Sequence, residues 1–501
     1  MKLVKISLAA ALACAAAVSV SADDAQPKRV LKGNMNVEYK ALPKNVESLN
    51  EAFTEGMFYG RLRTNAFRWD WKDDSNGDNK AFGLGGSLIY KSAPLYGFSG
   101  TAGLYYSNSP ISNWRQANEN VGEVKSGKDT FSRYNVYKTG DWQMAVLAQA
   151  YLQYNISKTD VKFGRQIFES ALTASNDTKM IPNTFEGVSI ESKDIPKTNL
   201  KAAYFTAQKL RDHTTFHDVI TYGTEMNNNN KGDWDNNDDS GAHKGISFKN
   251  LTNAGKDTNN DLIVAAVSNQ SIPNLKVDVT YTAVPDMISS VIGELNYGIP
   301  VGGVTITPGV RYMKQMDNGA GKVGGASLNG GLAGQTGAAK GYKDAASLDS
   351  TLWMARLAVV TGAFKGHVGY SKVEDEADIV APWRGFPTGG YTRAMAQLNW
   401  KANAESMMAE AQYDFGKAKI LPGFKAMARY AIQDSDEKKQ AAGGQADLTT
   451  IHVDLMQQIT PQLDAKFRLG MIDSEKRVLG GNAGKDADTY NEYRFEVNYL
   501  F

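Results

Sequence analysis

The sequence predicts an all-β protein, a transmembrane antiparallel β-barrel of about 18 strands with long extracellular loops. Three observations support this fold class: the last strand alternates to the final residue, the chain starts with a secretion signal, and its connections alternate in length. One alternating strand alone is weak evidence, because a soluble sheet also has one buried and one solvated face. Together the three favour a barrel whose strands turn one face to lipid and the other to a water-filled lumen.

The last strand alternates between apolar and polar side chains up to the final residue. A period of two indicates a β-strand that separates two environments. The side chains of the apolar set, which we expect to face lipid, are Tyr493, Phe495, Val497, Tyr499 and Phe501. Those of the opposite set, which we expect to face the lumen, are Glu492, Arg494, Glu496 and Asn498. A barrel strand that stops on a terminal Phe also resembles the assembly signal of bacterial outer-membrane proteins.

Residues 1–22 have the features of a cleaved secretory signal peptide. Two lysines precede an apolar stretch from Leu8 to Val20, and small residues precede Asp23. The stretch is too short and too rich in Ala for a good spanning helix. The alternative is a lipoprotein signal in which Cys14, the single cysteine, carries the lipid. Cleavage before Asp23 leaves a mature chain without disulfides, although it passes through an oxidising periplasm.

The composition narrows the class further. Removal of the two signal-peptide lysines leaves 53 of the 55 basic residues against 54 acidic ones, which argues against a general nucleic-acid binder. The 48 Gly, 23 Tyr and 19 Phe suit tilted strands with aromatic girdles. We therefore expect residues 23–55 to form an N-terminal periplasmic segment and residues 56–501 to form a multi-pass barrel in the outer membrane of a Gram-negative bacterium.

The connections between alternating segments are short on one side and long on the other, as in outer-membrane barrels. Most of the short ones carry Gly or Pro, which break strands. The short ones are Ser92–Gly97, Asn155–Thr159, Lys193–Thr198, Asn269–Asn274, Gly298–Gly303, Thr361–Lys365, Phe415–Gly423 and Ile459–Gln462. The longest are Asn108–Asp141, Lys209–Asn260, Asp317–Asp349 and Lys372–Tyr391. Nineteen candidate strands would put the two termini on opposite sides, so we assign the weakest, Arg393–Lys401, to a loop.

Basic side chains recur on the face of the strands that we expect to line the lumen. They are Arg61, Arg63, Arg311, Arg356, Lys425, Arg429, Lys466, Arg468 and Arg494. A row of guanidinium groups would draw anionic solutes through a pore in weak steps. The simpler interpretation is that each pairs with an inward acid. The candidate acids are Glu410, Asp414, Asp454, Glu492 and Glu496.

Several stretches together resemble the OprD-type porin family, in particular its epsilonproteobacterial members. The most specific match is Asp177–Val188, and others include Lys162–Gln166, Tyr391–Arg393 and Leu421–Gly423. The resemblance implies an eighteen-stranded barrel, commonly a trimer, with a ladder of basic side chains along its wall. It also implies that the third loop folds inward and narrows the pore. The candidate constriction residues in this loop are Glu169, Asn176, Asp177 and Lys179.

The function expected is passive diffusion of small hydrophilic solutes, with small carboxylates, amino acids or peptides as the substrates that the resemblance suggests. No enzyme motif and no cofactor site is expected, and the loop segments Asp73–Lys80 and Asp233–Gly241 lack the full ligand spacing of a calcium loop. The partners expected are outer-membrane lipid and lipopolysaccharide, two further chains of a homotrimer, and the solutes. The alternative function is a surface adhesin or structural protein that acts through its long loops.

Overall fold

The structure is a computed structural model of the 501-residue chain. It describes residues 29–31, 37–39, 43–72, 78–115, 127, 130–173, 180–220, 245–246, 248–327, 341–380, 383, 390–395, 399–436, 438–439, 447–475 and 489–501. The predicted signal peptide and the calcium-like segment 233–241 lie outside these residues. No helix in the described part of the chain is long and apolar enough to cross a membrane.

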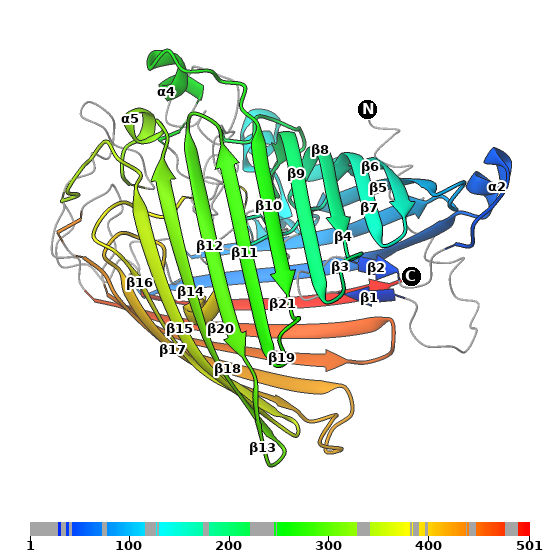
Figure 1. Cartoon of the computed structure of the whole chain (residues 1–501). Coiled ribbons are helices and arrows are strands. Elements are labelled where there is room, and N and C mark those ends of the chain that lie inside the picture. The colour runs from blue at the N-terminus through cyan, green and yellow to red at the C-terminus, as the bar shows by residue number, and fades with distance from the viewer. Residues whose placement is uncertain are drawn as a thin grey trace.

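The strands form one closed antiparallel barrel of 18 strands, as the sequence predicts (Figure 1). The short β13 continues β12 along the same neighbour, β14, so the two are parts of one interrupted strand. The barrel elements are β3 (Met57–Trp71), β4 (Asn79–Lys91), β5 (Phe98–Asn108), β6 (Gln143–Ile156), β7 (Thr159–Gln166), β8 (Thr184–Ser192), β9 (Thr198–Lys209), β10 (Leu262–Asn269), β11 (Leu275–Val284), β12 (Ile288–Tyr297), β13 (Ile299–Val301), β14 (Val304–Asp317), β15 (Ser350–Thr361), β16 (Phe364–Val373), β17 (Glu405–Asp414), β18 (Phe424–Asp434), β19 (Leu448–Gln458), β20 (Leu463–Ser474) and β21 (Tyr490–Leu500).

Few other elements are present among the described residues. Two three-residue strands pair with each other before the barrel, and the helices lie before the first barrel strand or in the loops. These elements are β1 (Arg29–Leu31), β2 (Val37–Tyr39), α2 (Leu49–Thr54), η1 (Ser112–Trp114), α3 (Arg133–Thr139), α4 (Phe248–Asn253), α5 (Gly321–Gly324) and η4 (Gly390–Thr392).

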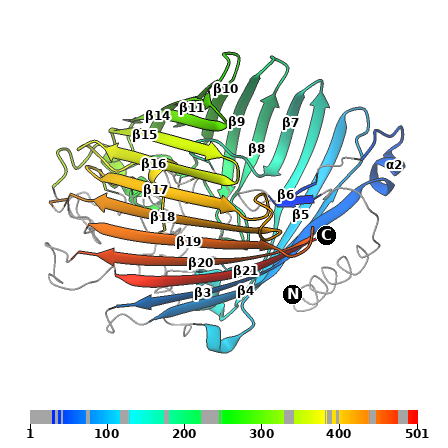
Figure 2. The same cartoon turned by 90° about the horizontal axis from the view of Figure 1, so that it is seen from below.

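The eight predicted short connections lie at the end of the barrel where the C-terminus lies (Figure 2), although the strand β13 occupies residues 299–301 of the predicted turn Gly298–Gly303. We call this the periplasmic end. The long connections lie at the opposite end, and the described part of Arg393–Lys401 contains no strand, as predicted. The connection after β16 therefore runs through that segment to residue 404.

The seam between the last and first strands contains one departure from the predicted alternation, and β-bulges at Gly103/Leu104 and Glu186/Gly187 shift the register elsewhere. Leu500 pairs with Arg61, and Phe501 exchanges two backbone hydrogen bonds with Gly60, with N–O distances of 3.0 and 3.2 Å. The Phe501 side chain was predicted to face lipid, but it is only 2% exposed. Gly60 permits this position, because a Cβ there would lie 2.0 Å from the Ser87 backbone oxygen and 3.1 Å from the tip of the Phe501 ring. The ring therefore occupies the space that the missing side chain leaves over the seam.

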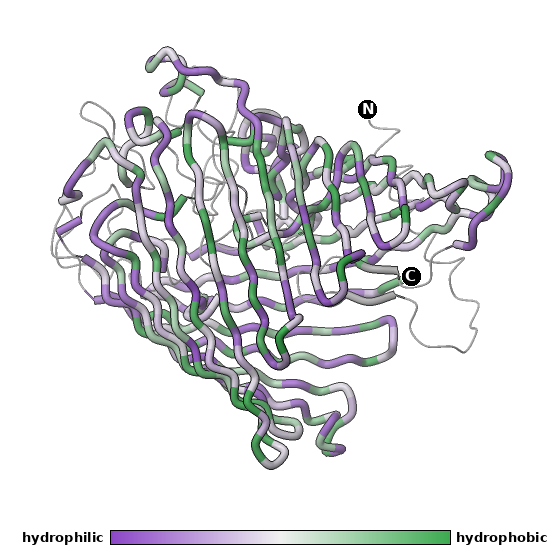
Figure 3. Tube along the Cα trace, viewed as in Figure 1, coloured by the Kyte–Doolittle hydropathy of each residue, from purple (hydrophilic) through white to green (hydrophobic). Residues whose placement is uncertain are grey.

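The two faces of the strands otherwise separate as predicted, and hydrophilic and hydrophobic residues alternate along most of them (Figure 3). Trp353, Val310 and Tyr430 lie on the outer face, with exposed fractions of 50, 52 and 49%. Half-exposed apolar side chains are expected on this face, because the outer surface of a membrane barrel contacts lipid hydrocarbon instead of water.

The loops do not stay at the rim of the barrel but form a shared hydrophobic cluster. Loop 3 (167–183), loop 4 (210–261), loop 6 (318–349) and loop 7 (374–404) all contribute to it. Their buried members are Phe168, Leu172, Val219, Ile220, Ile246, Leu251, Ala320, Val323, Ala326, Leu348, Ala377, Ile379, Val380, Trp383, Tyr391 and Trp400. The cluster packs on inward residues of the strands from β8 to β16, so this side of the lumen is covered by loops.

Candidate functional site

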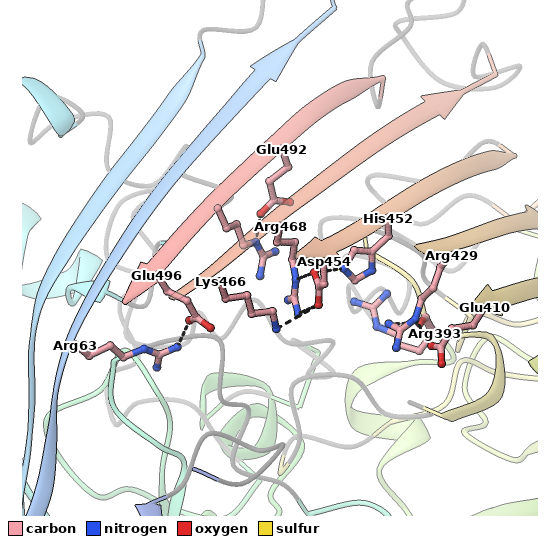
Figure 4. Close-up of polar contacts among 11 residues, drawn as sticks. Arg63, Arg393, Glu410, Arg429, His452, Asp454, Lys466, Arg468, Glu492 and Glu496 are labelled. Atoms are coloured by element: carbon pink, nitrogen blue, oxygen red, sulfur yellow. Dashed lines mark hydrogen bonds and ion pairs between the residues drawn. The ribbon is translucent and has the colours of Figure 1, made fainter. Parts of the chain in front are cut away.

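The side of the lumen from β17 through β21 to β3 carries a cluster of charged residues that we call the basic wall, and loop 7 reaches it through Arg393 and Met395. Figure 4 shows its side chains projecting from the inner side of these strands. Its cations are Arg63, Arg393, Arg429, Lys466, Arg468 and Arg494, and its carboxylates are Glu410, Asp454, Glu492 and Glu496. Six cations against four carboxylates leave an excess of two positive charges, with His452 set aside.

Seven of the nine predicted basic residues form ion pairs with carboxylates. The register explains several of these pairs: Arg429 lies directly opposite Glu410, and Lys425 lies opposite Asp414. The pairs and their N–O distances are Arg63–Glu496 2.6 Å, Arg311–Glu294 2.5 Å, Lys425–Asp414 3.1 Å, Arg429–Glu410 2.6 Å, Lys466–Asp454 3.2 Å, Arg468–Asp454 2.7 Å and Arg494–Glu492 2.5 Å. All five acids named from the sequence take part. The simpler interpretation, in which each basic residue pairs with an inward acid, thus has a structural counterpart in these seven pairs.

Asp454 is the most connected carboxylate of the basic wall. The Arg468 guanidinium donates two hydrogen bonds to it, at 2.7 and 2.9 Å, and the Lys466 ammonium lies 3.2 Å from Oδ2. His452 Nε2 lies 2.9 Å from Oδ1. Alternation along β19 puts His452 and Asp454 on the same face, and the register puts Arg468 opposite Asp454. A bidentate pair fixes the orientation of the guanidinium plane as well as its charge.

Loop 7 adds Arg393 to the basic wall. The sequence places this cation in a loop and predicts no role for it. Arg393 lies beside Arg429 in Figure 4, and Arg429 Nη1 donates to the Arg393 carbonyl oxygen at 3.2 Å. The Arg393 guanidinium carbon lies 5.6 Å from the centre of the Trp400 ring. The available signal was the Tyr391–Arg393 stretch, which contributed to the family resemblance but shows no strand periodicity.

Loop 7 also covers two of the predicted basic residues. The Tyr391 ring, 2% exposed, has the Arg356 guanidinium at 4.3 Å and the Arg311 guanidinium at 5.3 Å from its centre. Arg356 donates further to Asn296 Oδ1 at 2.6 Å. Gly390 makes this approach possible, since its φ is +74° and a Cβ would lie 2.8 Å from Arg311 Nη1. These two arginines belong to the loop-covered side of the lumen and not to the basic wall.

The remaining predicted basic residue, Arg61, is buried on β3, with 5% of its surface exposed. Its inward neighbour on the same strand, Arg63, belongs to the basic wall.

The third loop folds into the barrel, as the resemblance implies. Met180 and Ile181 are each 1% exposed and pack with buried residues of β4, β5 and β6. Of the predicted constriction residues, Asn176, Asp177 and Lys179 lie outside the described residues. Glu169 is described, and it lines a cavity of about 470 Å³ together with Lys201, Asp278 and other residues of the facing wall.

Comparison with known proteins agrees with this geometry. A family model described as outer membrane porin, OprD family, matches residues 137–501. The chain belongs to the OprD family of outer-membrane porins. No curated protein matches it. An OprD-family barrel is an outer-membrane channel for small solutes, and the chain is therefore a porin of a Gram-negative outer membrane.

Solved porin structures share the fold at low sequence identity. Pseudomonas aeruginosa OccK9 (OpdG) has a TM-score of 0.66 at 16% identity, over 90% of this chain and 99% of that one. Acinetobacter baumannii OccAB3 has a TM-score of 0.65 at 15% identity, over 89% and 99%. Pseudomonas aeruginosa OpdK with vanillate has a TM-score of 0.62 at 14% identity, over 90% and 99%. At these identities the likeness concerns the fold alone.

Proposed function

We propose that this porin is a passive diffusion channel that favours small solutes carrying a carboxylate, which include small organic acids, amino acids and peptides. The observation that supports the proposal is the excess of two positive charges on one side of a lumen whose other side is covered by loops. A solute that passes the loop cluster must therefore pass close to the basic wall. Guanidinium groups suit this role because they stay charged and bind carboxylates with a planar fork.

Because the cations of the basic wall are already paired with acids, a solute carboxylate is expected to bind them weakly and to pass through the channel. Arg63, Arg429, Arg468 and Arg494 of the basic wall each have a carboxylate partner, so a solute carboxylate must compete with an internal acid for the same guanidinium. Conduction requires binding that is strong enough for entry and weak enough for release. One of the solved relatives, OpdK, was determined with vanillate, which is a carboxylate. No energy input, cofactor or catalytic step is part of this proposal.

The first test is single-channel recording in a planar bilayer, with reversal potentials measured in a salt gradient. We expect anion preference that falls in Arg429→Ala and Arg468→Ala. Arg68→Ala is the matched control, because Arg68 lies on β3 with 57% of its side chain exposed and pairs with Asp70 instead of a residue of the basic wall. Equal reversal potentials in all four proteins would contradict a selective basic wall.

A second measurement addresses the substrate class. Liposome swelling compares a small carboxylate with its uncharged amide, which has the same size. Faster entry of the carboxylate into wild-type liposomes, and loss of that difference in Arg468→Ala, is the expected result. A folded barrel that shows no conductance at all would contradict an open channel and favour the adhesin alternative, which predicts that adhesion is lost on loop trimming.

The remaining partners and processing steps are part of the same proposal. Residues 1–22 would be removed on export, residues 23–55 would lie in the periplasm, and three chains would assemble as in related porins. Outward pairs such as Arg165–Glu186, with an N–O distance of 2.8 Å at the loop end of β7, support contact with lipopolysaccharide headgroups. Native mass and N-terminal sequence of the protein extracted from membranes test these statements.

A further inference from the structure

The short helix α2 is attached to the outside of the barrel at its periplasmic end. Ala93 N donates to the Ala52 carbonyl oxygen at 2.9 Å, and the Tyr90 hydroxyl donates to the Phe53 carbonyl oxygen at 2.7 Å. Tyr90 belongs to the outer face, because its ring lies 4.8 Å from that of Phe58, which is 62% exposed. Both views show α2 projecting sideways from the wall (Figures 1 and 2).

One exposed face of α2 is apolar. Leu49 and Phe53 are four residues apart, so they share one face of the helix, and they are 65 and 61% exposed. Such a face is costly in water but suits the boundary between headgroups and acyl chains. Since β3 begins at Met57, directly after α2, the helix forms the end of the periplasmic segment at the boundary of the membrane.

A hollow of about 620 Å³ lies between α2 and the outer wall of β4 to β7. Its floor includes Gly100 and Ala102, whose small side chains leave the wall recessed. Phe98, Leu152 and Phe163 also line it, and they are 55, 61 and 65% exposed. The lining is therefore a recess in the lipid-facing surface and not part of the lumen.

The hollow reaches from the membrane boundary into the hydrocarbon layer. Phe163 lies four residues along β7 from its first residue, Thr159, which corresponds to about 13 Å at the usual rise of a strand. A chain that fills the hollow would thus run along the wall away from the periplasmic boundary. That direction matches an acyl chain of the periplasmic leaflet, whose headgroup would lie beside α2.

The charges beside the hollow indicate which headgroup fits. Glu47, Glu51 and Glu55 are all exposed and flank or belong to α2, against one exposed cation, Lys44, in the described residues 43–48 before it. Three carboxylates repel an anionic headgroup and attract an ammonium. We propose that the hollow binds one acyl chain of an amine-bearing zwitterionic phospholipid, with α2 lying in the membrane interface beside the headgroup. This lipid site is separate from permeation and does not depend on the proposed solute class.

The test fills the hollow without disturbing the barrel. A Cβ at Gly100 would have only the Ser92 hydroxyl within 4.0 Å, so Gly100→Leu can extend into the hollow. The matched control is Gly293→Leu, because a Cβ at Gly293 meets nothing within 4 Å and this residue lies on β12, outside the hollow. Native mass spectrometry then counts phospholipids on each protein after exchange into an equal mixture of phosphatidylethanolamine and phosphatidylglycerol.

We expect wild type and Gly293→Leu to retain one more phosphatidylethanolamine per chain than Gly100→Leu, at equal channel conductance. Equal retention by the three proteins overturns the proposal, as does preferential retention of phosphatidylglycerol. A change of oligomeric state in Gly100→Leu alone also overturns it, because the occupant would then be a second copy of the chain.

The position of α2 is tested separately from lipid counting. A nitroxide on Phe53→Cys, in a Cys14→Ser background, should collide more often with membrane-soluble oxygen than with a water-soluble nickel chelate. The opposite order of accessibility would place the helix in water and overturn the proposal.

Discussion

Asp454→Asn tests whether the acids of the basic wall set its selectivity. The substitution keeps the shape of the side chain and removes one negative charge. The excess in the wall then rises from two positive charges to three. Anion preference should increase, in the opposite direction to the effect of removing an arginine.

The magnitude follows from the position of the carboxylate behind the guanidinium of Arg468. A solute ion in contact with that guanidinium lies roughly 6 Å from the lost charge, which corresponds to about 0.7 kcal/mol in a water-filled pore. That energy favours anions about threefold and disfavours cations about threefold, so the permeability ratio should change about tenfold. At 1 M salt, where the screening length is about 3 Å, most of the change should disappear.

The assay is the reversal potential in a salt gradient, at low and at high ionic strength. Asp414→Asn is the matched control, because Asp414 pairs with the more exposed Lys425 at the periplasmic end of β17. A heat-modifiable band in gel electrophoresis shows that each variant is folded, since loss of one partner of a buried ion pair can cost about 3–5 kcal/mol. An unchanged potential in folded Asp454→Asn at low salt would refute the reasoning.

Three further changes have expected outcomes. Tyr391→Ala should uncover the two arginines beneath the ring and raise the anion-to-cation permeability ratio about threefold at low salt, and an unchanged ratio would contradict the covering role of loop 7. Gly60→Val should lower the temperature of heat modification by roughly 1–3 °C, because the added side chain collides with the Ser87 backbone oxygen and the Phe501 ring, and overpacking costs about 1–3 kcal/mol. Burial and neighbouring cations hold the pKa of His213, in loop 4, well below its usual 6.5. Its folded-state pKa is thus depressed, so its stabilising contribution is present above about pH 6.5 and is lost on acidification. Protease cleavage of loop 4 should therefore rise severalfold when the pH falls from 7.5 to 5, and His213→Gln should reduce that rise. Cleavage of the wild type at a rate independent of pH would contradict a role for His213 protonation.

The strands could be predicted from the sequence because each has two different environments. Alternation places Lys466 and Arg468 on one face of β20 and Phe467 on the other, and the structure agrees. The turns were equally readable where Pro or Gly coincides with a loss of the alternation, although Pro308 and several glycines lie inside strands. The ion pairs were predictable only as a set, since the register that puts Arg468 opposite Asp454 is not visible in either strand alone.

The loop contributions could not be predicted, because irregular segments carry no period. Tyr391 reaches the arginines of β14 and β15 while Arg393 reaches Arg429 of β18, although only one residue separates them. Their positions depend on tertiary packing of loop 7 against Trp400 and the loop cluster. Phe501 was misplaced for a related reason: strict alternation assumes a side chain on the neighbouring strand, and Gly60 has none.

The shared cluster of loops 3, 4, 6 and 7 also limits how this surface can be remodelled. A loop that hangs free at a rim can be exchanged or deleted as a separate module, but each of these four loops is part of the packing of the other three. Removal of one would leave Trp383 or Ile246 facing an aqueous vestibule and would loosen its neighbours. A sequence change selected in one loop by antibodies or phages must therefore be compatible with the packing of the other three loops. Engineered epitopes or sensor domains should enter outside the clustered residues, where the channel mouth does not depend on them.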